Sequence, residues 1–109
     1  MSTAALLVYC TVPSAPVADA LARTLVEERL AACVNRIAGV VSTYRWEGEV
    51  KADPELLLLI KTTADRFEAL RARIVELHPY ELPGVIAVGI EAGLDRYLEW
   101  IATETRDGV

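Results

Sequence analysis

The chain has 109 residues, 53% of them hydrophobic, which suits one domain with its own core, so we expect a single domain over residues 1–109. Its formal net charge of −5 argues against binding nucleic acid or an anionic membrane, because both need clustered positive charge. Its two cysteines, Cys10 and Cys33, lie far apart and form neither a disulfide framework nor a CxxC zinc motif.

The first predicted elements are a strand and a helix. An apolar run from Ala5 to Val12, ending at Pro13, is typical of a buried strand. Ser14 can then cap a helix, and the apolar residues that follow recur on one helical face. We expect this helix to run to about Ala31.

A long hairpin follows. The stretch from Cys33 to Trp46 is rich in β-branched residues, and Gly39 inside it indicates a bulge or bend. Glu47-Gly48 is a plausible two-residue turn, because Gly readily supplies a positive φ. A return strand is expected from Glu49 to Thr62.

The return strand has two parts with different composition. Asp53-Pro54 interrupts its first part, which we expect to be an edge or bulged segment because Pro cannot donate a ladder hydrogen bond. Leu56 to Ile60 is apolar without alternation, which favours a strand covered on both faces.

Two helices and a strand complete the chain. Thr62 or Thr63 can cap a helix whose apolar stripe holds Phe67, Leu70, Ile74 and Leu77, and Pro79 stops that helix near His78. The last strand is expected at Val85 to Ile90, and a short helix at Asp95 to Thr105.

The element order βαββαβ, with an extra C-terminal helix, predicts an α+β ferredoxin-like fold with an antiparallel sheet in strand order 4-1-3-2. This topology places Cys10 and the segment from His78 to Tyr80 at one end of the sheet. The tip of the long hairpin points beyond that same end, while Cys33 lies at the opposite one.

The hairpin is too long for the domain. Each arm has roughly 14 residues, or about 45 Å when extended, whereas a domain of this length has a radius of gyration near 13 Å and is about 34 Å across. An overhang leaves backbone groups unpaired, so we expect pairing with another copy of the chain. A free surface hairpin is the alternative.

Five segments, in order from about Leu7 to Ile101, resemble the CutA divalent-cation tolerance proteins. They are Tyr9-Cys10-Thr11-Val12-Pro13, Leu25 to Asn35, Tyr44-Arg45-Trp46-Glu47-Gly48, Ile60-Lys61-Thr62-Thr63 and His78-Pro79-Tyr80-Glu81-Leu82-Pro83. The resemblance implies a ferredoxin-like fold and a homotrimer whose long hairpins pair between subunits. It also implies a cytoplasmic bacterial protein linked to tolerance of copper and other divalent metals.

Cys10 and His78 are the candidate metal ligands. Topology brings them to one sheet edge, and a thiolate with an imidazole suits copper or zinc. Some members of the resembled family bind copper through a cysteine and two adjacent histidines, but Leu77 stands at the second histidine position here. The alternative is that Cys10 packs in the core and His78 caps a helix. Neighbouring copies could add Glu47, Glu49 or Glu81.

The hairpin aromatics Tyr44 and Trp46, together with Glu47 and Tyr80, are expected at the oligomer interface, where aromatic residues are enriched. Stacking on a planar ligand is the alternative for the aromatics. Cys10 and His78 lack a recognisable orienting carboxylate or oxyanion hole, so we expect no enzyme activity and no organic cofactor.

The leading functional hypothesis is therefore a cytoplasmic homotrimer that binds copper or other divalent ions and contributes to metal tolerance, without nucleic-acid or membrane partners. Two alternatives stay open. One is a trimeric small-ligand sensing or signalling module resembling nitrogen-regulatory proteins, and the other is a structural trimer that presents a surface to a partner protein.

Overall fold

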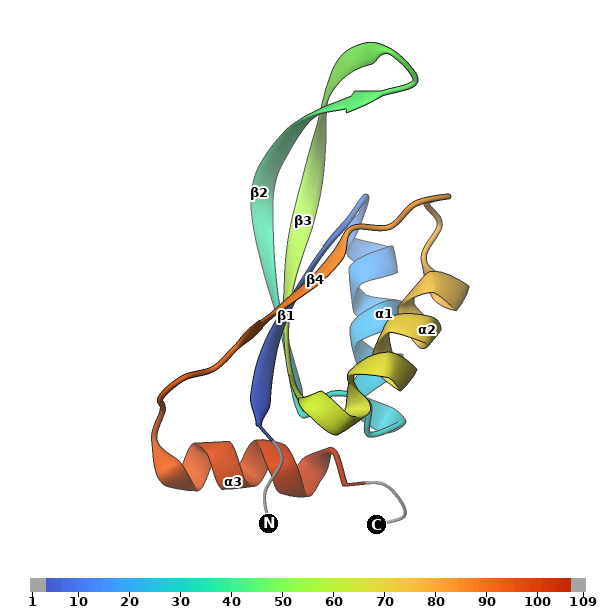
Figure 1. The fold of residues 1–109 in the computed structure, drawn as a ribbon. Helices are drawn as coiled ribbons and strands as arrows, with labels where there is room; N and C mark the ends of the chain where they lie inside the picture. Colours follow the sequence, from blue (N-terminus) through green and yellow to red (C-terminus); the bar gives the residue numbers. More distant parts are fainter. Residues whose placement is uncertain (1–3, 107–109) are drawn as a thin grey trace.

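A four-stranded antiparallel sheet with helices on one face forms the chain, as the computed structural model shows for residues 4–106 (Figure 1). The sheet order is β2-β3-β1-β4, which confirms the predicted ferredoxin-like arrangement. The strands are β1 (Ala5–Val12), β2 (Cys33–Trp46), β3 (Glu49–Thr63) and β4 (Val85–Gly89), and the helices are α1 (Ala15–Glu27), α2 (Phe67–Leu77) and α3 (Asp95–Glu104), with a 3₁₀ helix η1 (Ala64–Arg66) before α2.

Helix α1 begins where the sequence predicts and ends earlier. The Ser14 side chain accepts a hydrogen bond from a backbone N–H of the first turn, as expected of an N-cap. The helix stops at Glu27 rather than near Ala31, because Arg29 adopts a left-handed φ of 59°. The next amide, of Leu30, then bonds back to the carbonyl of Leu25, which is the Schellman pattern.

The start of α2 also differs from the prediction. Thr63 precedes the 3₁₀ turn η1, but its hydroxyl does not cap the backbone. It lies 2.6 Å from a carboxylate oxygen of Asp65, to which it donates. Leu70 and Ile74 are fully buried, whereas Leu77 is 39% exposed, and the helix ends before His78 as Pro79 requires.

The hairpin of β2 and β3 has the predicted turn and bulge. Trp46 pairs with Glu49 across a two-residue turn in which Glu47 and Gly48 both have positive φ, 49° and 82°, as a type I′ turn needs. The register shifts between Ile37 and Val40, beside Gly39 with a φ of 84°.

Pro54 lies in a segment of β3 that has a neighbouring strand on one side only. It pairs with Val41 without a break in register, so β3 is not bulged there. Strand β1 pairs with β3 only from Leu56 onwards, which leaves residues 49–55 on an edge, as predicted.

Helices α1 and α2 cover one face of the sheet, while α3 lies beside the end where the described chain begins (Figure 1). The core contains Val8, Cys10, Leu58 and Ile60, all fully buried, under the apolar sides of α1 and α2. Among residues 4–106 no helix lies on the opposite face, so the described part of the chain does not supply the expected cover on both faces of residues 56–60.

The molecule is elongated because the hairpin protrudes. Its principal extents are 47 × 26 × 22 Å, and its radius of gyration is 14.5 Å, larger than the 13 Å expected for a compact domain of this length. Figure 1 shows the hairpin rising well beyond β1 and the loop before β4. Within residues 4–106, no helix is long and apolar enough to cross a membrane.

Candidate functional site

Cys10 and His78 both lie at the end of the sheet from which the hairpin protrudes. Cys10 lies in β1 opposite Val85 at the start of β4, and the ring of His78 contacts the carbonyl oxygen of the adjacent Thr11. Cys33 pairs with Lys61 at the opposite end. The predicted placement of the three residues is therefore confirmed, although their chemical role is a separate question.

Both ring nitrogens of His78 are occupied by the backbone. Nδ1 accepts a hydrogen bond from the Tyr80 amide at 3.1 Å, so Nε2 carries the proton that it donates to the Thr11 carbonyl at 2.8 Å. The side chain is 7% exposed, and its ring packs against Tyr80 with a centroid distance of 4.6 Å. The imidazole therefore joins α2, the following loop and β1.

Cys10 is a protonated thiol in this environment. It is fully buried, and its burial together with the nearby charge of Glu55 raises its pKa to about 11. Metal bonding needs the thiolate, so a metal would have to displace this proton.

The donor types fit a copper or zinc site, but one chain supplies too few of them. Among residues 4–106, no group of three His, Cys, Asp or Glu side chains is placed to hold a metal ion. The carboxylates named as additional ligands, Glu47, Glu49 and Glu81, are all exposed. They do not complete the pair of Cys10 and His78 within the same chain.

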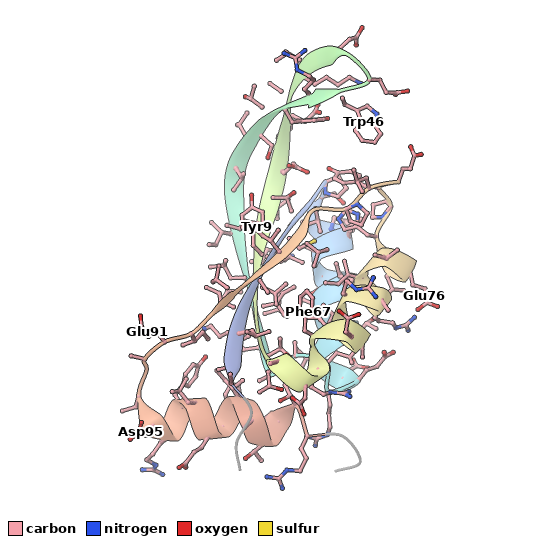
Figure 2. All side chains as sticks on the ribbon, viewed as in Figure 1. Tyr9, Trp46, Phe67, Glu76, Glu91 and Asp95 are labelled. Atoms are coloured by element: carbon pink, nitrogen blue, oxygen red, sulfur yellow. The ribbon has the colours of Figure 1, made fainter. Side chains whose placement is uncertain are left out.

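A cleft of about 640 Å³ lies between the overhanging hairpin and the loop before β4. We call it the hairpin cleft and define it by six of its lining residues, Ser42, Tyr44, Trp46, Lys51, Glu55 and Tyr80. In Figure 2 the ring of Trp46 projects from the hairpin on the side of this loop. Three of the four residues predicted at the oligomer interface thus line a cleft within one chain; the fourth, Glu47, is in the turn.

The base of the hairpin cleft carries a buried acid that sequence reasoning missed. Glu55 is only 8% exposed, and its Oε2 accepts a hydrogen bond of 2.6 Å from the Tyr80 hydroxyl. Burial of Tyr80 and this hydrogen bond raise the pKa of the phenol, so it stays a donor at neutral pH. The available signal was the position of Glu55, a charge directly before the apolar run of β3.

Tyr44 makes a similar but exposed contact. Its hydroxyl donates to a carboxylate oxygen of Asp53 on the same face of the hairpin, and this hydrogen bond raises the pKa of the phenol. The lining of the hairpin cleft thus includes two tyrosine rings whose hydroxyl groups donate to carboxylates.

Comparison with known proteins gives one consistent family. The model described as CutA1 divalent ion tolerance protein matches residues 6–104. A divalent-cation tolerance protein CutA of Thermus thermophilus is 52% identical over 99 residues, which cover 91% of this chain and 96% of that protein. The chloroplastic CutA of Arabidopsis thaliana is 45% identical over 102 residues, covering 94% of this chain and 56% of that protein.

Solved structures agree with this result. The crystal structure of CutA from Xylella fastidiosa matches with a TM-score of 0.93 at 47% sequence identity, and the match covers 95% of this chain and 100% of that one. The similarity therefore includes the protruding hairpin as well as the core.

Proposed function

The chain belongs to the CutA1 divalent ion tolerance protein family, and we propose on this premise that it is a homotrimer that binds copper or another divalent metal ion and contributes to metal-ion tolerance. The observation that carries the metal proposal is that the Sγ atom of Cys10 and the Nε2 atom of His78 both contact the Thr11 carbonyl oxygen, at 3.7 Å and 2.8 Å. The proposal includes no catalysed reaction, in keeping with the family's description as tolerance proteins.

The bare face of the sheet supports the oligomer. Tyr9, Ile86 and Val88 are 41%, 61% and 58% exposed on this face, and Leu57 and Leu59 are half-buried there. A contiguous apolar face of this kind on a small protein marks a surface for association. Copies of the same chain are the proposed cover, because closed symmetry can bury such a face in every subunit.

The hairpin supports the same oligomer from its edges. β2 is an edge strand over its whole length, and β3 lacks a second neighbour before Leu56. Unpaired strand edges readily pair with another chain. We propose that hairpins of neighbouring copies pair, with Glu47 in the contact and with Tyr44, Trp46 and Tyr80 at its border, where the hairpin cleft opens.

The metal proposal assigns two donors per chain, the Cys10 thiolate and a ring nitrogen of His78. Binding requires loss of the Cys10 proton and of one His78 hydrogen bond, so the affinity will be modest. The remaining ligand positions are assigned to carboxylates of a neighbouring copy, such as Glu81, or to water.

Calorimetric titration of the assembled protein with Zn(II), and with Cu(I) under anaerobic conditions, tests the site. Cys10→Ala and His78→Ala are each expected to weaken binding at least tenfold, while Cys33→Ala, at the other end of the sheet, leaves it unchanged. Circular dichroism checks that the variants fold. Equal binding by all variants, or no binding by the wild type, would reject the assignment.

We further propose a cytoplasmic location. Both cysteines are free thiols, which suits a reducing compartment. The Arabidopsis relative is named as chloroplastic, so location varies among relatives. Fractionation of cells that produce the protein, with blotting against a terminal tag, tests the assignment, and recovery in a periplasmic fraction would overturn it.

A further inference from the structure

We propose that the hairpin cleft binds a small zwitterionic molecule of dipeptide length, with its ammonium group at Glu55 and its carboxylate at Lys51. The proposal goes beyond metal tolerance and uses neither Cys10 nor His78. A cleft of about 640 Å³ is in the usual size range for small-molecule sites.

Glu55 supplies the anionic end of the site. It is more than nine-tenths buried, and Tyr80 donates to Oε2. Within residues 4–106 no group donates to Oε1, and this oxygen keeps access to solvent through the cleft. An ammonium group at Oε1 would replace water as the donor and neutralise the charge of the carboxylate.

Lys51 supplies the cationic end. It lies on the same face of β3 as Glu55, since the two are four residues apart along the strand, and both line the cleft. Its ammonium forms no salt bridge within the part of the chain that the structure describes. A ligand carboxylate would neutralise it.

The spacing of the two charges sets the length of the ligand. Four residues of strand separate the Cα atoms of Lys51 and Glu55 by about 13 Å, and if both side chains extend straight from the strand, two hydrogen bonds of about 2.8 Å leave roughly 7 Å between the ligand's charges. Two residues of extended chain cover this distance, whereas the charges of a single α-amino acid lie much closer together. A dipeptide therefore fits better than a free amino acid.

Aromatic rings supply the walls. Tyr44, Trp46 and Tyr80 all line the cleft, and Figure 2 shows the Trp46 ring projecting from the hairpin toward the loop side. Such rings favour both a neighbouring cation and an aromatic side chain. The proposed ligand thus carries an aromatic or bulky apolar side chain between its charged ends.

The test uses the full-length assembled protein in EDTA, so that its result is independent of metal binding. Calorimetry compares glycyl-L-phenylalanine with its N-acetyl derivative, its C-terminal amide and L-phenylalanine. The unmodified dipeptide is expected to bind at least tenfold more tightly than each of the other three. The proposal would be overturned if the dipeptide shows no binding at concentrations on the order of 10 mM, or if the N-acetyl derivative binds equally well.

Two variants assign the charges. Glu55→Gln, which can still accept the Tyr80 hydrogen bond, is expected to weaken dipeptide binding about tenfold without changing the weak binding of the N-acetyl derivative. Lys51→Ala should weaken the dipeptide but not its amide. Glu49→Gln, which changes an exposed acid of the same strand outside the cleft, is the matched control. Equal losses in Glu55→Gln and Glu49→Gln would contradict the assignment.

Discussion

At the scale of single residues, the two cysteines show how position in the sheet decides the character of a thiol. Cys10 is fully buried in the core beneath the helices, whereas Cys33 begins the edge strand β2 and is partly exposed. Burial and the charge of Glu55 raise the pKa of Cys10 to about 11, so its reactive thiolate is scarce at neutral pH.

This difference predicts selective alkylation of the native protein. With iodoacetamide at pH 8, Cys33 is expected to react first and Cys10 much more slowly, as followed by mass spectrometry of peptides. Because the pKa of Cys10 is raised, its thiolate fraction, and hence its rate, should rise roughly tenfold per pH unit until about pH 11. Urea-unfolded protein, in which both sites are open, is the control. Faster labelling of Cys10 than of Cys33 would contradict the structure.

The hydrogen bond between Tyr80 and Glu55 predicts a second residue-scale effect. Tyr80→Phe leaves the buried carboxylate without its donor, which is expected to lower the free energy of unfolding by about 1 kcal/mol. Tyr44→Phe removes a hydroxyl whose carboxylate partner is open to water, so the unfolding midpoint should stay unchanged. Urea unfolding at one fixed protein concentration measures both. A loss in Tyr44→Phe as large as in Tyr80→Phe would refute the distinction.

At the scale of elements, local chemistry was predictable and contacts between distant segments were not. Gly39 and Gly48 marked the bulge and the turn because each needs a positive φ that Gly adopts freely. The early end of α1 was missed because Arg29, rather than Gly or Asn, occupies the left-handed position. The role of Glu55 was also missed, because it depends on a loop 25 residues further along the chain.

The hairpin turn gives a pair of opposite predictions at this scale. Gly48→Ala places a Cβ at a φ of 82° and is expected to lower the free energy of unfolding by about 1 kcal/mol. Glu47→Asn should raise it by roughly 0.5 kcal/mol, because Asn-Gly is a preferred type I′ sequence and Asn tolerates the φ of 49°. Denaturant unfolding at fixed concentration compares them. A stabilising Gly48→Ala would show that the turn is not type I′.

At the scale of the whole molecule, the helices within residues 4–106 cover only one face of the sheet. Leu58 and Ile60 are fully buried under the helices, but their neighbours Leu57 and Leu59 face the bare side with Tyr9. The unbroken apolar run of β3 predicted cover on both faces, whereas the helices in the described part of the chain cover only one of them. The sequence pattern therefore suits the strand as it would be in the proposed homotrimer, in which other copies would cover the bare face.

A charge on the bare face tests this assembly. Wild type is expected to scatter light as a particle of three times the chain mass of 11.9 kDa. Leu59→Asp should reduce this to the mass of one folded chain. In a monomer the position is half-buried, so water can reach the new carboxylate, whereas a trimer would bury the carboxylate without a partner for its charge. Val75→Asp, at a position of α2 that is 51% exposed, is the matched control and should remain trimeric. A trimeric Leu59→Asp, or a monomeric wild type, would mean that other copies do not cover this face, and with that result the homotrimer proposal would fall.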